Sequence, residues 1–206
     1  MGDAAIDDMV GKTDSFRLFV GAPVPIEWQD VLRVAIEQWQ PLSVRWLQPQ
    51  QWHLTFVFIG NVPLLLVRGL DQEMARVFSG FRPFPLRFDQ FSGVPHRNPR
   101  MIWARFQPHP EFSQTVHLLH KRISHFLERH HRPPPPPLHH PIIPHITLAR
   151  WRHPMRHPLI LETVVSPPLL RVTSAHLYRS ILGPAGAQYQ VLASYPTSKP
   201  FLPLWH

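Results

Sequence analysis

A short pattern that occurs twice limits how this chain can fold. His53-Leu54-Thr55 stands at the head of an apolar run, and His145-Ile146-Thr147 stands at the head of a second run in the other half of the 206-residue chain. Both runs have the length and composition of short β-strands. Because side chains alternate between the two faces of a strand, the His and Thr of each copy point the same way. We therefore expect two strands that each present one imidazole and one hydroxyl from a single face.

Two such strands set opposite each other would gather two imidazoles and two hydroxyls. Imidazole has the side-chain pKa nearest to neutral pH, so one copy can accept a proton while the other donates one. The hydroxyls can donate hydrogen bonds to phosphate oxygens. These are the groups that in-line attack on a phosphodiester requires: a base, an acid and donors for the developing charge. The pattern is symmetric and does not say which histidine is the acid. A single His-x-Thr pair is ordinarily structural, and the second copy is what favours a shared site.

Hydrophobic periodicity predicts strands and helices without regular alternation, which is typical of an α+β fold. The predicted helices cover residues of about 28–39, 67–78 and 109–129. The predicted strands cover residues of about 16–20, 44–47, 53–59, 86–91, 101–106, 145–151, 169–182 and 188–195. Gly60-Asn61-Val62-Pro63 is expected to end the strand that starts at His53.

The chain is expected to form a single domain over residues 16–197. Residues 1–15 are predicted to be a flexible leader, and residues 198–206 a C-terminal tail. Residues 129–144 are predicted to form a Pro-rich loop, in which Pro133 to Pro137 favour an extended polyproline II conformation. Two interpretations of this loop stay open, since it is either a rigid exposed connector or a border of the groove beside the second motif.

Composition excludes several classes of chemistry. There is no cysteine, so disulfides, a thiolate nucleophile and Cys-ligated metals are excluded. The 15 histidines include no His-Glu-x-x-His pattern, and we expect neither a metal nor a cofactor. The sequence also lacks a Gly-x-Ser-x-Gly elbow and a Gly-x-x-x-x-Gly-Lys phosphate loop.

Charge and hydropathy point to a partner and a location. The formal net charge is +8 and the cations are mostly arginine, which suits an anionic partner such as RNA. The leader has no apolar stretch typical of a signal peptide, and the run Leu64–Val67 is far too short to span a membrane. We expect a cytoplasmic monomer that does not associate with membranes.

With these residues in view, the chain resembles the RNA 2′,3′-cyclic phosphodiesterases, historically called 2′-5′ RNA ligases, of the two-histidine phosphoesterase superfamily. The resemblance covers about residues 16–197. Besides the two motifs it is carried by shorter stretches in the same order, namely Arg17–Val20, Val44–Trp46, Arg100–Ala104, Leu177–Ser180 and Gly186–Tyr189.

The resemblance implies a bilobal α+β fold with two pseudo-symmetric lobes, each with an antiparallel sheet and flanking helices around a central groove. It implies hydrolysis of a terminal 2′,3′-cyclic phosphate on RNA, with tRNA fragments among the candidate substrates, to a 2′-phosphomonoester. His53 would be the proton donor and His145 the proton acceptor. Thr55 and Thr147 would hold phosphate oxygens, and Arg150 would add positive charge.

Three alternatives stay open. The chain could be an RNA-binding module of the same fold with vestigial catalysis, although both histidines and both threonines are present. It could act mainly as a reversible 2′-5′ RNA ligase, or as a phosphodiesterase of a small nucleotide. Among the aromatic residues, Trp46, Trp103 and Trp151 are candidates for stacking on a base or for core packing.

Overall fold

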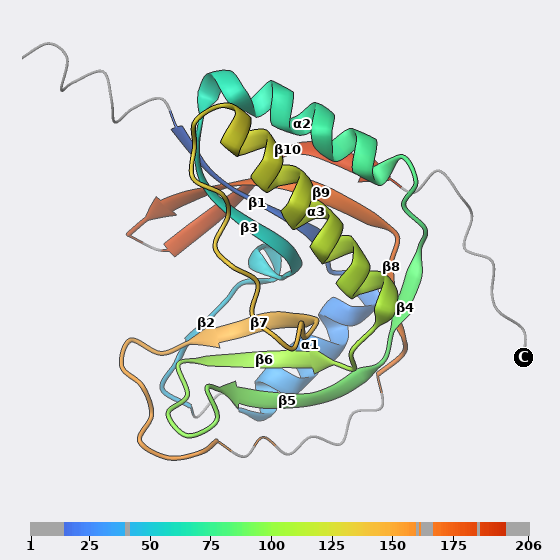
Figure 1. The fold of residues 1–206 in the computed structure, drawn as a ribbon. Helices are drawn as coiled ribbons and strands as arrows, with labels where there is room; N and C mark the ends of the chain where they lie inside the picture. The colour runs from blue at the N-terminus through green and yellow to red at the C-terminus, as the bar shows by residue number, and fades with distance from the viewer. Residues whose placement is uncertain (1–14, 40–41, 160, 162–166, 185, 197–206) are drawn as a thin grey trace, which may run out of the picture.

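A computed structural model describes residues 15–39, 42–159, 161, 167–184 and 186–196 (Figure 1). The helices are α1 (Ile26–Gln38), the short 3₁₀ helix η1 (Pro49–Gln51), α2 (Leu64–Phe78) and α3 (Pro110–Arg129). The strands are β1 (Ser15–Pro23), β2 (Arg45–Trp46), β3 (His53–Pro63), β4 (Phe84–Leu86), β5 (Phe88–Val94), β6 (Met101–Phe106), β7 (His145–Arg150), β8 (Leu170–Val172), β9 (Ser174–Gly183) and β10 (Gly186–Pro196).

Two antiparallel half-sheets meet in the middle of the molecule. The strand order is β10-β9-β1-β3-β7-β6-β5, with β2 beside β7. The upper lobe in Figure 1 contains β10, β9, β1 and β3, and the lower lobe contains β7, β6, β5 and β2. Between β3 and β7 the one paired position is Leu54 opposite Ile146. The two lobes therefore join at the central residues of the two repeated motifs, and the predicted bilobal α+β fold is confirmed.

The three helices each have one apolar face, and they bury it by packing on the two half-sheets. In Figure 1, α2 and α3 lie side by side over the upper half-sheet, while α1 lies against the lower one. On α1 the Trp28 ring is fully buried, with its centroid 5.0 Å from that of Phe106 on β6. The Tyr195 hydroxyl of β10 donates a 2.6 Å hydrogen bond to Asp71 Oδ1 of α2, which ties the last strand of the sheet to the helix that covers it.

Two predicted strand boundaries were wrong for tertiary reasons. Strand β3 continues through Gly60 to Pro63, because Gly60 adopts a φ of 95° and pairing with β1 resumes after a register shift. The predicted strand over 169–182 is two strands. β8 leaves the main sheet to pair with β4, whereas β9 pairs with β1 and β10.

The remaining predicted segments have these outcomes. β1 begins at Ser15, the last residue assigned to the leader, and residues 1–14 and 197–206 lie outside the described part. Residues 130–144 contain no helix or strand. Among the described helices, none has the length and apolar character needed to cross a bilayer.

Candidate active site

The junction between the lobes determines how the two motifs face each other. Leu54 and Ile146 are opposite each other in antiparallel strands, so His53 lies across from Thr147 and Thr55 lies across from His145. Leu54 and Ile146 are buried in the core. Because side chains alternate along a strand, the His and Thr on either side of them point to the opposite face. This is the face that carries the cavity.

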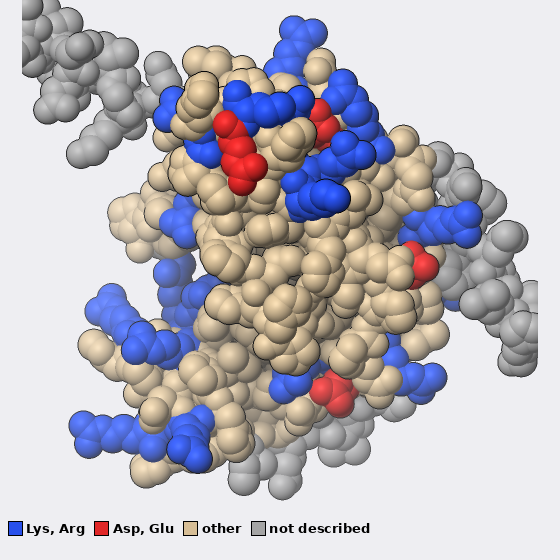
Figure 2. Space-filling model, viewed as in Figure 1, with Lys and Arg blue, Asp and Glu red and all other residues tan. Residues whose placement is uncertain are grey.

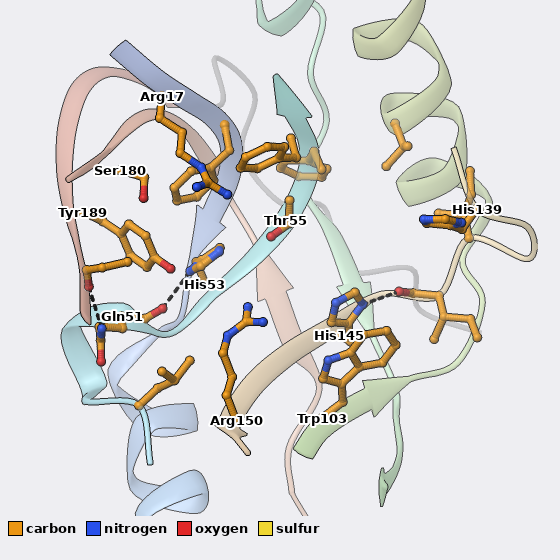
Figure 3. A pocket seen from close by; sticks show the side chains of 18 of the residues that line it. Arg17, Gln51, His53, Thr55, Trp103, His139, His145, Arg150, Ser180 and Tyr189 are labelled. Carbon is orange, nitrogen blue, oxygen red and sulfur yellow. Dashed lines mark hydrogen bonds between the residues drawn. The ribbon is translucent and has the colours of Figure 1, made fainter. Parts of the chain in front are cut away.

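A cavity of about 830 Å³ lies between the lobes and is lined by His53, Thr55, His145 and Arg150 (Figure 3). These are four of the five predicted site residues. The fifth, Thr147, is on the same face of β7 as His145 but does not line the cavity. It is half-buried, and its register partner on β6 is Trp103.

The positive charge of the cavity comes from three elements. Arg17 of β1 and Arg45 of β2 line it together with Arg150 of β7, and no Asp or Glu is among its described lining residues. All three guanidinium groups lower the pKa of Tyr189 against the larger effect of burial, which raises it. An anion in this cavity would therefore meet three cations and, among the described lining residues, no carboxylate.

Each imidazole is held by the same kind of main-chain contact. His53 Nδ1 lies 2.7 Å from the carbonyl oxygen of Gln51, and His145 Nδ1 lies 2.8 Å from that of Ile143. In each motif the carbonyl belongs to the residue two positions earlier. A carbonyl only accepts, so Nδ1–H must be the donor, and a neutral ring then carries its lone pair on Nε2. The two histidines thus offer the same nitrogen for proton transfer.

Aromatic rings surround both histidines but differ between the lobes. The His53 ring centroid lies 4.6 Å from Phe19 and 5.0 Å from Tyr189. His145 is stacked on Trp103, with centroids 3.6 Å apart and ring planes at 15°. These contacts restrict each ring and remove water from its faces.

Burial lowers the pKa of both histidines. The pKa of His53 falls to about 4, with the charges of His145 and Arg150 adding to the effect of burial and the Gln51 carbonyl opposing it. The pKa of His145 is lowered in the same way, with Arg150 and Arg105 adding to burial and the Ile143 carbonyl opposing it. Both rings are neutral at pH 7 in the free protein, so each can act first as a base.

Two close contacts hold the first motif in place. A Cβ atom added to Gly21 of β1 would lie 2.8 Å from the Leu54 carbonyl oxygen, so the residue at this position must be glycine for β1 to approach the motif this closely. Gln51 donates from Nε2 to the carbonyl oxygen of Ala187 at 2.6 Å, which ties the segment before His53 to the β9–β10 hairpin.

The structure adds residues whose role the sequence did not reveal. Trp103 lines the cavity and contacts His145, whereas Trp46 and Trp151 pack against the core. The Pro-rich loop borders the cavity through residues 138–143, the second of the two interpretations left open. The position of the loop just before His145 was the sequence signal that it could border the cavity. No sequence signal predicted the stacking of Trp103 on His145, because that contact depends on the β6–β7 register.

Comparison with known proteins agrees with this architecture. The pattern of the 2′-5′ RNA ligase superfamily matches residues 28–183. An RNA 2′,3′-cyclic phosphodiesterase of Thermotoga maritima is 25% identical over 154 residues, which cover 71% of this chain and 76% of that protein. One from Methanothermobacter thermautotrophicus is 26% identical over 167 residues, covering 78% of this chain and 84% of that protein.

Solved structures share the fold. The crystal structure of the protein TT0787 of Thermus thermophilus superposes with a TM-score of 0.76 at 27% identity, covering 87% of this chain and 97% of that one. Apo LigT of E. coli superposes with a TM-score of 0.61 at 20% identity, covering 91% of this chain and all of the other.

The two lobes, the paired motifs and the cationic cavity between them define a two-histidine phosphoesterase. Within that class, the chain belongs to the 2′-5′ RNA ligase superfamily.

Proposed function

We propose that this protein hydrolyses the 2′,3′-cyclic phosphate at the 3′ end of an RNA to a 2′-phosphomonoester. The observation that carries the proposal is the matched pair of imidazoles, each anchored through Nδ1 to the carbonyl two residues earlier. Both line one cavity, whose described lining residues include no Asp or Glu. The names of the relatives from Thermotoga and Methanothermobacter support the same substrate.

The reaction needs one proton to enter and one to leave. His145 Nε2 takes a proton from water as the oxygen attacks phosphorus. The bond from phosphorus to the 3′ oxygen breaks, and His53 Nε2–H donates its proton to that oxygen, so the 2′-phosphomonoester and a free 3′ hydroxyl result. The choice of His53 as the acid follows the family resemblance, because both rings are anchored alike.

Substrate binding supplies the protonated acid. A neutral His53 has no Nε2 proton to give, and its low pKa keeps it neutral in the free protein. The negative phosphodiester entering between the rings favours their charged forms and raises both pKa values. Arg150 and the Thr55 hydroxyl then meet the charge that develops on the non-bridging oxygens, and Thr147 is proposed as a further donor.

The test is incubation of the protein with an oligoribonucleotide ending in a 2′,3′-cyclic phosphate, in EDTA, with identification of the product end. We expect a 2′-phosphate, and its formation should be almost abolished in His53→Ala and in His145→Ala. Each variant is compared with wild type by circular dichroism to establish that it is folded.

Other outcomes would separate the alternatives. Normal turnover by a folded His145→Ala protein would refute the two-histidine mechanism. Joining of a second oligonucleotide that carries a 5′ hydroxyl would indicate 2′-5′ ligation. Tight RNA binding with neither product would indicate a binding module.

A further inference from the structure

A second hollow lies outside the catalytic cavity, in the lower lobe. It has a volume of about 660 Å³ and lies between the turn joining β5 to β6 and the loop after β7. Arg100, His153 and Arg156 line it, and no Asp or Glu is among its described lining residues. Both arginines are exposed, and within the described ranges neither guanidinium has a hydrogen-bond or ion-pair partner.

The two segments that form this hollow are fastened to each other by the main chain. Trp151 donates from its backbone N–H to the Arg100 carbonyl at 2.9 Å, and Met155 donates to the Pro99 carbonyl at 2.9 Å. Arg100 in turn donates its backbone N–H to the Val94 carbonyl at 2.8 Å. The hollow is therefore a built feature of the fold rather than a chance approach of two free loops.

The hollow adjoins the catalytic cavity through one strand pair. Arg150, which lines the catalytic cavity, is the register partner of Met101, and Arg100 is the residue before Met101. Positive charge thus continues from Arg150 to Arg100 and then to Arg156. In Figure 2, basic side chains continue from the recess between the lobes on the left to the lower left, over the ends of β5 and β6 and the loop after β7, without Asp or Glu between them.

The sequence explains why acidic side chains are missing from this part of the described surface. Residues 93–110 contain no Asp or Glu, and neither do residues 129–161. These two stretches supply β6, β7 and every residue of the second hollow. By contrast, the arginines towards the β9–β10 hairpin already contact rings, since Arg17 lies over Phe58 and Arg179 lies over Phe16.

We infer that this second hollow binds the phosphate backbone of the RNA on the 5′ side of the cyclic phosphate. The inference rests on the proposed function. A cyclic phosphate occupies the 3′ end of its strand, so the rest of the strand must leave the catalytic cavity in the 5′ direction. Arg100 and Arg156 offer it unpaired guanidinium groups, which suit phosphate oxygens.

The consequence is a dependence on substrate length. A mononucleoside 2′,3′-cyclic phosphate fills the catalytic cavity and has no upstream phosphate. A hexaribonucleotide with the same end reaches both sites. The hollow should therefore strengthen use of the hexamer and leave the mononucleotide unaffected.

The test uses the double variant Arg100→Gln/Arg156→Gln, with Arg68→Gln/Arg122→Gln as a control of equal charge change on exposed positions of α2 and α3. Each single-strand phosphate contact contributes about 0.7 to the slope of log affinity against log salt, so two lost contacts should reduce the slope by about 1.4. The ratio of wild-type to variant affinity for a labelled hexamer should then fall about sevenfold between roughly 50 and 200 mM salt. The control should keep the wild-type slope.

Kinetics and binding together distinguish the two proposals. We expect kcat/KM for adenosine 2′,3′-cyclic phosphate to stay within about twofold of wild type in the double variant, while kcat/KM for the hexamer falls. Equal loss for both substrates, or an unchanged salt slope, would overturn the inference. If wild type hydrolyses neither substrate, the proposed function fails, and the salt slope of hexamer binding measured by fluorescence anisotropy still decides whether the hollow holds RNA.

Discussion

Replacing Trp103 by leucine should slow catalysis through His145. The indole ring stacks on the imidazole at a centroid distance of 3.6 Å, and leucine removes that ring while keeping an apolar side chain on β6. A stacked aromatic pair is worth about 0.5–1.5 kcal/mol beyond the area it buries. If that energy holds His145 in its productive orientation, kcat should fall between about 2-fold and 13-fold.

The same substitution should move the pH profile. Burial is the largest cause of the lowered pKa of His145, and removing the indole admits water to one face of the ring. The pKa should rise towards 6.5, so the limb of kcat/KM that the titration of His145 controls should move to higher pH. A residue that merely fills space would change stability without this movement.

The assay is steady-state hydrolysis of a 2′,3′-cyclic phosphate from about pH 4.5 to 8.5, a range that brackets the ordinary histidine pKa, with thermal unfolding measured on the same samples. Trp103→Phe keeps an aromatic face and should retain most of the activity and the wild-type pH profile. A folded Trp103→Leu protein with the kcat and pH profile of wild type would refute the positioning role.

Three further predictions follow from the same site. In wild type, kcat/KM should fall about tenfold per pH unit above pH 6.5, because both histidines titrate below their usual pKa and the singly protonated pair becomes scarce; an alkaline limb that begins only above about pH 7 would contradict this. Gly21→Ala should destabilise the protein by about 1–3 kcal/mol in urea unfolding and lower kcat, because its Cβ would force the strand carrying His53 to shift. Thr55→Ala should lower kcat on the order of 10- to 1,000-fold through loss of a phosphate donor, while Thr55→Ser keeps the hydroxyl and should retain most activity.

The alternation of apolar and polar residues along the sequence was enough to predict a strand such as β6, where buried and half-buried positions alternate without interruption. The six residues of β6 alternate half-buried and buried positions, and the predicted range 101–106 is the observed one. The repeated His-x-Thr pattern likewise predicted that each pair shares a face. The prediction of one strand over residues 169–182 was wrong because β8 pairs with β4, which is distant in the sequence, and so separates from β9. Nothing in the sequence near residue 173 indicates that partner.

The sequence pattern singled out four side chains that line the cavity, but it did not indicate what surrounds them. The histidines carry their own signal, but the carbonyls of Gln51 and Ile143 that hold them are main-chain atoms that any residue supplies. Arg45 reaches the cavity because its guanidinium passes Gly186, where an added Cβ would overlap it. That approach joins segments far apart in the chain and depends on the assembled fold.

Anchoring the imidazoles through main-chain carbonyls has a consequence for mutational robustness. No side-chain replacement at position 51 or 143 removes the acceptor, so the tautomer of each histidine is insulated from most point mutations around it. The Gln51 side chain is engaged elsewhere, on the Ala187 carbonyl, and can change without touching the Nδ1 contact of His53. The Nδ1 contacts that fix each tautomer then depend on the strand geometry that places the two carbonyls, so the side chains at positions 51 and 143 can change while Nε2 stays free for proton transfer.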